Sequence, residues 1–454
     1  MNMEDTLFPL PPEQDSEETV SGKPRLKRAN RAQMQFRTMD LDSSLPSEHP
    51  ARLVWEFVQQ LDLGPWYAEI RAVEGQAGQN AIDPAILMAL WLYATLEGVG
   101  SARALDRLCK EHDAYRWICG GVTVNYHTLS DFRVNHTEHL EELLTKSVAA
   151  LLVEGLVKMN RVSQDGKRVR ASAGSKSFRR RKTMQHCLRD AREQVEGLRK
   201  ELEEHPEGTS KRQKAAQERA KRERQERVEK ALERMKELEA RQEKNVKAKT
   251  VKREKLKPAR ASTTDPEAQV MKMPDGGFRP AYNAQFSTDT ESMIIVGVDV
   301  TNQGNDSGLT SPMVAQIQEH YHQVPDEYLV DGGFVNLDDF TKAGQMGTKI
   351  YAPVTTNRTP KTDPYQPKRG DSLEIIAWRK RMATDQAKQI YKERASTAEC
   401  INAIQHNRGL TSFRVRGLKK VKAVLLWFAL IHNLMRGYKL RMEAQKKSGA
   451  LQAA

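Results

Sequence analysis

The chain has 454 residues, which is enough for two or three domains and a large buried core. It carries 73 Lys and Arg against 60 Asp and Glu, a formal net charge of +13. This excess favours a polyanionic partner, nucleic acid before membrane. No CxxC motif pairs the four cysteines, which fits a reducing cytoplasm and speaks against a structural zinc site or a disulfide framework.

Neither a signal peptide nor a membrane span is expected. Residues 1–45 open with an acidic, proline-rich stretch, so we predict a disordered lead-in. The longest apolar runs are Ala85–Leu96 and Ala423–Ile431. Both are shorter than the roughly 20 residues that a membrane span needs, so we expect buried helices in a soluble protein.

Residues 46–158 are predicted to form an N-terminal bundle of helices. Asp83 and Pro84 are typical of a helix start, Ser101 is expected to begin the next helix, and Ser130 is a plausible cap further on. One helix of this bundle could bind DNA through exposed bases, the candidates being Arg103, Arg107 and Arg133. Solvated helix faces are an equally good interpretation of these arginines.

Residues 177–257 are rich in charge and poor in aromatic side chains. Thin but periodic apolar positions predict two long helices that fold back as an antiparallel hairpin, interrupted at residues 205–208. The expected seam consists of Val195, Leu198, Leu202, Val228, Leu232, Met235 and Leu238. A charged face of this kind is usually only solvated, although its excess of bases allows a supporting contact with a DNA backbone.

The rest of the chain mixes strands and helices. Three segments rich in β-branched residues predict buried strands: Met293–Asn302, Asp326–Asn336 and Gly347–Val354. Helical segments follow at about 372–406 and 419–441, and residues 442–454 are expected to be a flexible tail. This alternation predicts an α/β or α+β domain made of residues 159–176 and 258–441.

Two carboxylates stand where predicted strands end. Asp165 in "VSQDG" and Asp331 in "YLVDGG" are both followed by glycine, which lets the backbone turn away tightly. Strand ends are where α/β sheets place their ligands. Asp-Gly is also a common turn, so neither aspartate alone indicates a catalytic site.

A third carboxylate, Glu399, lies in the predicted helix "IYKERASTAECINAIQHNRG". It is off the apolar stripe of that helix and faces either a polar cleft or water. Three converging carboxylates are the minimal protein contribution to a two-metal site, because hard cations require oxygen ligands. Two such ions can activate the attacking oxygen and stabilise the leaving oxygen when a phosphodiester is cut or rejoined.

Five segments, taken in order, resemble the DDE transposases of bacterial insertion sequences, in the IS-five-like group. They are the helical stretch "DPAILMALWLYATLEGVGSARALDRLCKEHDAYRWICGG…TLSDFR", then "SQDGKRVRASAG", "STTDPEAQVMK…FRPAYNAQ", "YLVDGGFVN", and "YKERASTAECINAIQHNRG" with the apolar helix after it. The match runs roughly from residue 48 to 438. It implies an N-terminal helical domain and an RNase H-like catalytic domain, which the charged hairpin interrupts.

The resemblance also implies roles for particular residues. Asp165, Asp331 and Glu399 match the catalytic, metal-binding triad. Tyr391 and Arg394 match the tyrosine–arginine–glutamate pattern and are expected to contact DNA. The family pattern ends in a basic residue beyond the glutamate; His406 and Asn407 occupy that region here, and Arg408 is the nearest substitute. Lys167 and Arg168, which follow Asp165, are further expected DNA contacts.

Two other acids could replace members of this triad. Asp299 lies on a predicted strand but lacks following glycines, and Glu374 precedes the glutamate helix but lacks the tyrosine and arginine companions. The first triad is therefore preferred.

The implied function is transposition, a form of DNA recombination. The helical domain would bind terminal inverted repeats, and the catalytic site would use two Mg²⁺ ions, or Mn²⁺ in their place, for strand cleavage and transfer to target DNA. At least a homodimer on DNA, no membrane partner, and a bacterial cytoplasmic location associated with the nucleoid are expected.

Two competing hypotheses remain. One is a catalytically inactive DNA-binding protein derived from a transposase, against which the intact triad argues. The other is a coiled-coil scaffold, whose short and interrupted seam does not explain the strands on either side.

Overall fold

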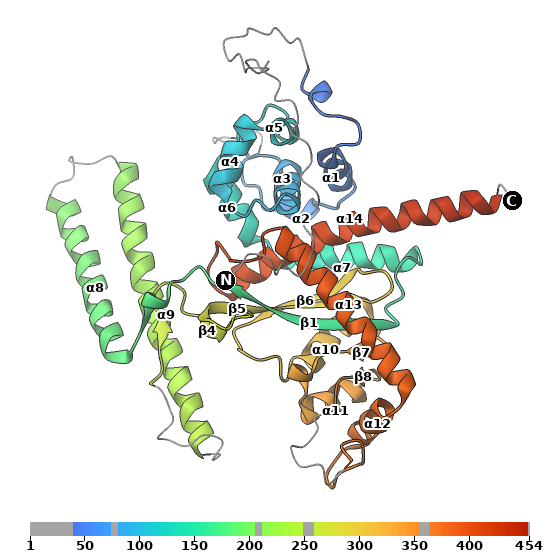
Figure 1. Ribbon diagram of the computed structural model, residues 1–454. Helices are drawn as coiled ribbons and strands as arrows, with labels where there is room; N and C mark the ends of the chain where they lie inside the picture. Colours follow the sequence, from blue (N-terminus) through green and yellow to red (C-terminus); the bar gives the residue numbers. More distant parts are fainter. Residues whose placement is uncertain (1–39, 74–79, 205–210, 248–257, 355–362, 453–454) are drawn as a thin grey trace, which may run out of the picture. The chain divides into compact units, whose positions relative to one another are not determined.

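The computed structural model describes residues 40–73, 80–204, 211–247, 258–354 and 363–452. Figure 1 shows their helices and strands. The described residues from Leu41 onward cluster as one compact unit. The predicted lead-in up to residue 39 lies outside the described residues, and the predicted domain boundaries within the large unit stay a prediction.

The N-terminal region is a bundle of helices, as predicted. Its members are α1 (Pro50–Gln59), α2 (Gly64–Ala68), α3 (Pro84–Leu96), α4 (Ala102–Glu111), α5 (Asp113–Cys119), α6 (Tyr126–Asn135) and α7 (Thr137–Val153). The side chains of Asp83 and Ser101 cap α3 and α4, which confirms both predicted starts. The prediction of Ser130 as a helix cap is wrong. It lies inside α6, whose first backbone amides are capped by Asn125.

The central element is a mixed β-sheet. It contains β1 (Arg161–Arg170), β4 (Gln269–Lys272), β5 (Phe278–Asp289), β6 (Ile295–Thr301), β7 (Glu327–Leu329) and β8 (Lys349–Tyr351). On one side of β1, the pairs β1–β5, β5–β4 and β5–β6 are antiparallel. On the other side, β1–β7 and β7–β8 are parallel. The fold is therefore α+β, and this sheet is consistent with the RNase H-like domain that the resemblance implies.

Helices cover the sheet. They are α10 (Thr310–Tyr321), α11 (Leu337–Gln345), α12 (Leu373–Met382), α13 (Asp385–Asn407) and α14 (Leu418–Gln452). Helix α13 contacts β1, while α10 and α14 contact β6. The helical stretch predicted at 372–406 breaks before Thr384, whose side chain caps α13.

Helix α14 continues through Gln452, so the predicted tail from residue 442 is helical as far as that residue, and its flexibility stays a prediction. The segment contains many good helix formers such as alanine, glutamine and lysine. Adding residues to an existing helix costs far less than starting one, so the helix extends.

The charged region forms the predicted antiparallel hairpin of α8 (Arg181–Glu204) and α9 (Lys211–Lys247) (Figure 1). It is inserted between β1 and β5, and a two-stranded sheet of β2 (Phe178–Arg179) and β3 (Ala261–Ser262) closes its base. Of the predicted seam, Leu198, Val228 and Met235 are buried. The predicted interruption at 205–208 and the side chain of Leu202 lie outside the described residues.

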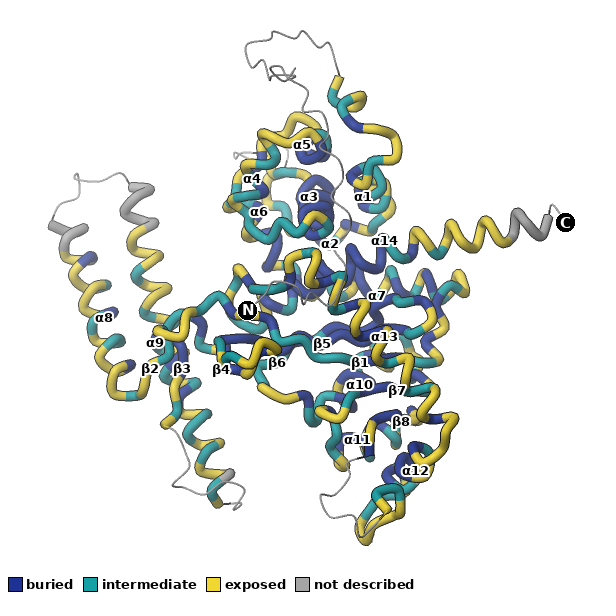
Figure 2. Tube along the Cα trace, viewed as in Figure 1, coloured by how far each residue is buried: buried dark blue, intermediate teal, exposed yellow. Residues whose placement is uncertain are grey.

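The main hydrophobic core runs without a break from the N-terminal helices to the sheet. Figure 2 shows buried residues along α3 and the central strands, and mainly exposed or half-buried residues along the hairpin. Both long apolar runs are buried in helices, as predicted, one in α3 and one in α14. Among the described residues, no helix combines the length and apolarity needed to cross a membrane.

The prediction that Arg133 is an exposed base is wrong, since only 7% of its surface is exposed. Its guanidinium lies 4.5 Å from the centre of the Trp91 ring and donates to the Gly100 carbonyl at 2.7 Å. Burial lowers the pKa of Arg133 to about 10. This arginine packs the bundle together instead of presenting charge to a partner.

Candidate active site

Asp165 lies in the middle of β1, not at its end. It is paired with Phe286 of β5, and the strand continues through Gly166 to Arg170. The predicted turn at Gly166 is therefore wrong. The dipeptide is part of a regular ladder because β5 supplies a partner for every residue of β1 from 162 to 170.

Gly166 is required for another reason, which is the close approach of a side chain. A Cβ atom at this position would lie 2.2 Å from Oδ1 of Asp306 and 2.5 Å from Nε2 of Gln285. Asp306 is held there because its Oδ1 accepts hydrogen bonds from Asn283 at 2.7 Å and Gln285 at 2.8 Å. A buried polar network thus supports β1 directly beside Asp165.

Asp331 does follow a strand end, as predicted. It comes just after β7 and caps a short 3-10 helix, Gly332–Phe334, by accepting from the Gly333 amide at 2.7 Å. Strands β1 and β7 are adjacent and parallel. Asp331 and Asp165 therefore converge although they are far apart in the sequence.

Arg394 of α13 joins the two aspartates. Its Nη2 donates to Asp165 Oδ1 at 2.9 Å and lies 3.6 Å from Asp331 Oδ2. The Nε of Arg394 is buried and has no hydrogen-bond partner in the part of the chain that the structure describes. A single cation thus lies between two carboxylates, which is electrostatically favourable because the acids repel each other.

Burial raises the pKa of the Asp165 carboxyl, and the nearby Asp331 raises it further. Arg394 and a hydrogen bond from Asn402 oppose this by favouring the ionised form. The influence of Asp331 on Asp165 indicates that the two acids belong to one electrostatic cluster. Such a cluster is a candidate site for a cation.

Asn402 is a site residue that the sequence analysis missed. Its Nδ2 donates to Asp165 Oδ2 at 2.7 Å, and its main-chain carbonyl accepts from Nζ of Lys167 at 2.9 Å. Asn402 lies two turns after Arg394 on the same face of α13, and this spacing was the available signal. Burial lowers the pKa of Lys167 to about 8.

Glu399 is not brought into contact with the two aspartates. It is exposed, and it has no hydrogen-bond or ion-pair partner among the described residues. At 100° per residue it points about 60° away from Asn402 around the helix axis, so it lies beside the face that meets Asp165. It points about 140° away from Arg394, so the structure leaves Glu399 on the solvent side of α13.

The alternative acids are positioned less well. Asp299 pairs across β5 with Gln285, whose partner on β1 is Gly166, so Asp299 lies on the face of the sheet opposite to Asp165. Glu374 packs against Gly344 of α11. A Cβ atom added to Gly344 would lie only 2.7 Å from the Cγ atom of Glu374.

The residues expected to contact DNA form two groups: a first group that lies at the aspartates and a second group that lies away from them. Tyr391 lies one turn before Arg394, and the charges of both aspartates help burial to raise its pKa. Lys167 also belongs to the cluster through Asn402. Arg168, in contrast, is on the opposite face of β1, where it donates to the Gly304 carbonyl at 3.1 Å.

Arg408 belongs to the second group. It lies just beyond the C-terminus of α13 and lines a cavity of about 250 Å³ together with Arg133. One of its terminal nitrogens is buried and without a hydrogen-bond partner in the described chain. The structure therefore does not bring Arg168 and Arg408 to the aspartates.

Asp165 and Asp331 suit a hard divalent cation, since they supply oxygen ligands and already attract one positive group. A third ligand is not assembled around them. In the described residues, three groups of metal-binding type meet only at Glu69, His136 and His139, in the helical bundle.

Two separate regions of the chain match the models of known protein families. Residues 39–135 match the model of a transposase domain (DUF772), and residues 368–437 match that of a transposase DDE domain. Both matches support an insertion-sequence DDE transposase. Neither match distinguishes the IS-five-like group, which stays a prediction. Searches of curated proteins and of solved structures gave no match.

The two matches cover different parts of the transposase. The first spans α1 to α6, and the second includes α12, α13 and most of α14, with Arg394, Glu399 and Asn402. Asp165 and Asp331 lie outside both. DDE domains generally use divalent metal ions, and the family implies DNA as the partner.

Proposed function

We propose that this transposase binds the ends of its insertion sequence, cleaves DNA strands there, and joins the resulting 3′-hydroxyls to target DNA. The observation that supports this most directly is the convergence of Asp165 and Asp331 from adjacent strands onto Arg394. Two acids held close together are unfavourable unless a cation neutralises them. Their convergence on one arginine favours a role in phosphate chemistry.

Asp165 and Asp331 would hold the divalent ions, two Mg²⁺ or Mn²⁺, with Glu399 as the third ligand. When bound, such ions activate the attacking oxygen and stabilise the leaving one. Glu399 is exposed and free of other partners among the described residues, so its side chain can turn toward the aspartates without breaking a bond.

Arg394 and Lys167 would act on the DNA side of the site. Arg394 neutralises the aspartates in the structure, and it would be free to leave them if a bound metal ion neutralised them instead. A guanidinium then suits a DNA phosphate, which it binds with two parallel hydrogen bonds. Asn402 keeps Asp165 oriented through its amide. Tyr391 lies next to Arg394 on α13 and would help to position the strand.

The helical bundle would bind the terminal repeats, and two protein copies would process two ends together. Arg103 and Arg107 remain candidates for phosphate contacts, although Arg107 pairs with Glu111 at 3.6 Å and Arg103 stacks on Tyr126. Because Arg133 is buried, it has no part in this proposal.

The test is strand cleavage on DNA that carries the ends of the element, with Mg²⁺ or Mn²⁺. We expect cleavage by the native protein and a loss of roughly 100-fold or more in Asp165→Asn, Asp331→Asn and Glu399→Gln, with DNA binding retained. Asp299→Asn is the matched control, since it neutralises a carboxylate on the opposite face of the sheet.

Other outcomes would change the proposal. DNA binding without cleavage by the native protein would favour the inactive, transposase-derived binder. Undiminished cleavage by Asp165→Asn or Asp331→Asn would exclude the site. If only Glu399→Gln kept full activity, another acid would be the third ligand.

A further inference from the structure

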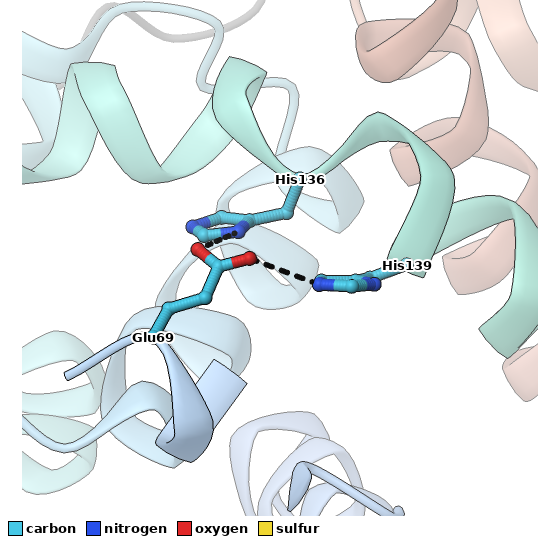
Figure 3. Close-up of side chains that lie close together, drawn as sticks. All are labelled: Glu69, His136 and His139. Carbon is cyan, nitrogen blue, oxygen red and sulfur yellow. Dashed lines mark hydrogen bonds and ion pairs between the residues drawn. The ribbon is translucent and has the colours of Figure 1, made fainter. Parts of the chain in front are cut away.

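A second cluster of metal-binding side chains lies in the helical bundle, apart from the aspartates (Figure 3). Glu69 directly follows α2, His136 lies between α6 and α7, and His139 is in the first turn of α7. Nε2 of His139 is 3.0 Å from Oε1 of Glu69, and Nδ1 of His136 is 3.3 Å from Oε2. The carboxylate thus faces both imidazoles.

The spacing of these atoms is that of a coordination site. One ligand atom from each residue falls within 4.8 Å of the other two. A tetrahedral ion with ligand distances of about 2.0–2.2 Å holds its donor atoms about 3.3–3.6 Å apart. Small rotations of three side chains would therefore be enough to surround an ion. The imidazole rings are already nearly parallel, at 14° and 6.1 Å between centroids.

The surroundings also suit a bound ion. Nδ1 of His136 is buried and makes no well-oriented hydrogen bond in the described part of the chain. Glu69 is exposed, which gives an ion a path from solvent. The buried Trp66 ring forms one wall, 5.1 Å from His139 and 6.1 Å from His136.

We propose that Glu69, His136 and His139 bind one divalent transition-metal ion, with Zn²⁺ as the best fit. Two imidazoles and one carboxylate suit Zn²⁺, whereas Mg²⁺ requires oxygen ligands. The sequence has no CxxC motif, which argues against a cysteine-based zinc site, but the site proposed here uses no cysteine. Three protein ligands leave a fourth position for water, and the ion would tie the end of α2 to the junction of α6 and α7.

The experiment measures Zn²⁺ binding to the full-length, chelator-treated protein in competition with a chromophoric chelator. We expect one tightly held Zn²⁺ per chain, at least a tenfold loss of affinity in Glu69→Gln and in His139→Ala, and no competition from millimolar Mg²⁺. Glu69→Gln removes one charge from an exposed side chain, so it should fold normally. His127→Ala is the control, because His127 is exposed on α6, outside the cluster.

Two further readouts separate this site from the aspartates. Zn²⁺ should raise the melting temperature of the native protein by a few degrees but not that of Glu69→Gln, since a ligand that binds only the folded state stabilises it. Asp165→Asn should bind Zn²⁺ as the native protein does. Zn²⁺ binding that is absent from the native protein, or equal in Glu69→Gln, His139→Ala and His127→Ala, would overturn the proposal.

Discussion

At the scale of single residues, Asp165 shows how hydrogen bonds offset the unfavourable burial of a carboxylate. Its carboxylate is largely buried, which alone would favour the neutral form. Arg394 and Asn402 oppose this effect through two hydrogen bonds, at 2.9 and 2.7 Å. Both come from α13, so the charge on a strand of the sheet depends on a helix more than two hundred residues later.

Gly166 gives a prediction at this scale. We expect Gly166→Ala to lower the free energy of unfolding by about 1–3 kcal/mol or more, because the new methyl group would displace Asp306 and break its hydrogen bonds with Asn283 and Gln285. Denaturant unfolding followed by circular dichroism measures this change.

The control for this prediction is Gly174→Ala. Gly174 has an ordinary extended conformation and no atom within 4 Å of an added Cβ, so alanine should leave stability unchanged or raise it slightly. Equal stability of Gly166→Ala and the native protein would show that the Asp306 network does not constrain β1.

At the scale of elements, the two faces of β1 have separate tasks. Asp165 and Lys167 point toward α13 and build the candidate site. Gln164, Gly166 and Arg168 point to the other face, where Gln164 bonds to Gln285 and Arg168 to Gly304. Because side chains alternate along a strand, neighbouring residues of "SQDGKR" belong either to the candidate site or to the hydrogen-bond network on the opposite face of the sheet.

The hairpin of α8 and α9 has a small core of its own, formed by Met184, Val228, Ala231, Met235 and Ala261. We expect Met235→Ala to destabilise the hairpin by about 2–5 kcal/mol, since a fully buried side chain would leave a cavity. Hydrogen exchange should quicken in α8 and α9 while β1 and β5 keep their protection.

The neighbouring Lys236 is exposed, so Lys236→Ala should leave exchange in the hairpin unchanged. If Met235→Ala also loosened the central sheet, the hairpin would not be an independent unit of stability.

At the scale of the whole molecule, one core joins the two matched regions. Trp427 of α14 is fully buried and donates to the Arg133 carbonyl of α6 at 3.0 Å. Asn433, on the same helix, accepts from the Ile295 amide of β6 at 2.9 Å and donates to its carbonyl at 2.8 Å. Helix α14 therefore fastens the N-terminal bundle to the sheet.

We accordingly expect Trp427→Ala to cost about 3–5 kcal/mol and to destabilise both regions together. Hydrogen exchange should quicken in α3 and α6 and, in the same measurement, in β6. Tyr438→Ala is the control on the same helix, because Tyr438 is 43% exposed. Loosening of the bundle alone would show that the two regions unfold separately.

The sequence by itself determined the elements that depend on local chemistry. Three elements follow from short-range rules, and the structure has each of them: the caps at Asp83 and Ser101, the charged hairpin with part of its seam, and the strand before Asp331. The transposase resemblance was confirmed by the family matches at both ends of the chain. The roles of Asp165, Asp331 and Glu399 stay a prediction.

Only the tertiary structure decided what surrounds these residues. Asp165 sits inside a strand because β5 pairs with β1 along residues 162–170, and nothing near Asp165 in the sequence reveals that partner. Arg133 is buried because Trp91 and α14 enclose it, so a residue that looks like a surface base became part of the core. Asn402 reached Asp165, and two histidines met Glu69, through contacts between distant segments. Periodicity indicates which face of an element is apolar, but long-range packing alone decides which polar groups meet.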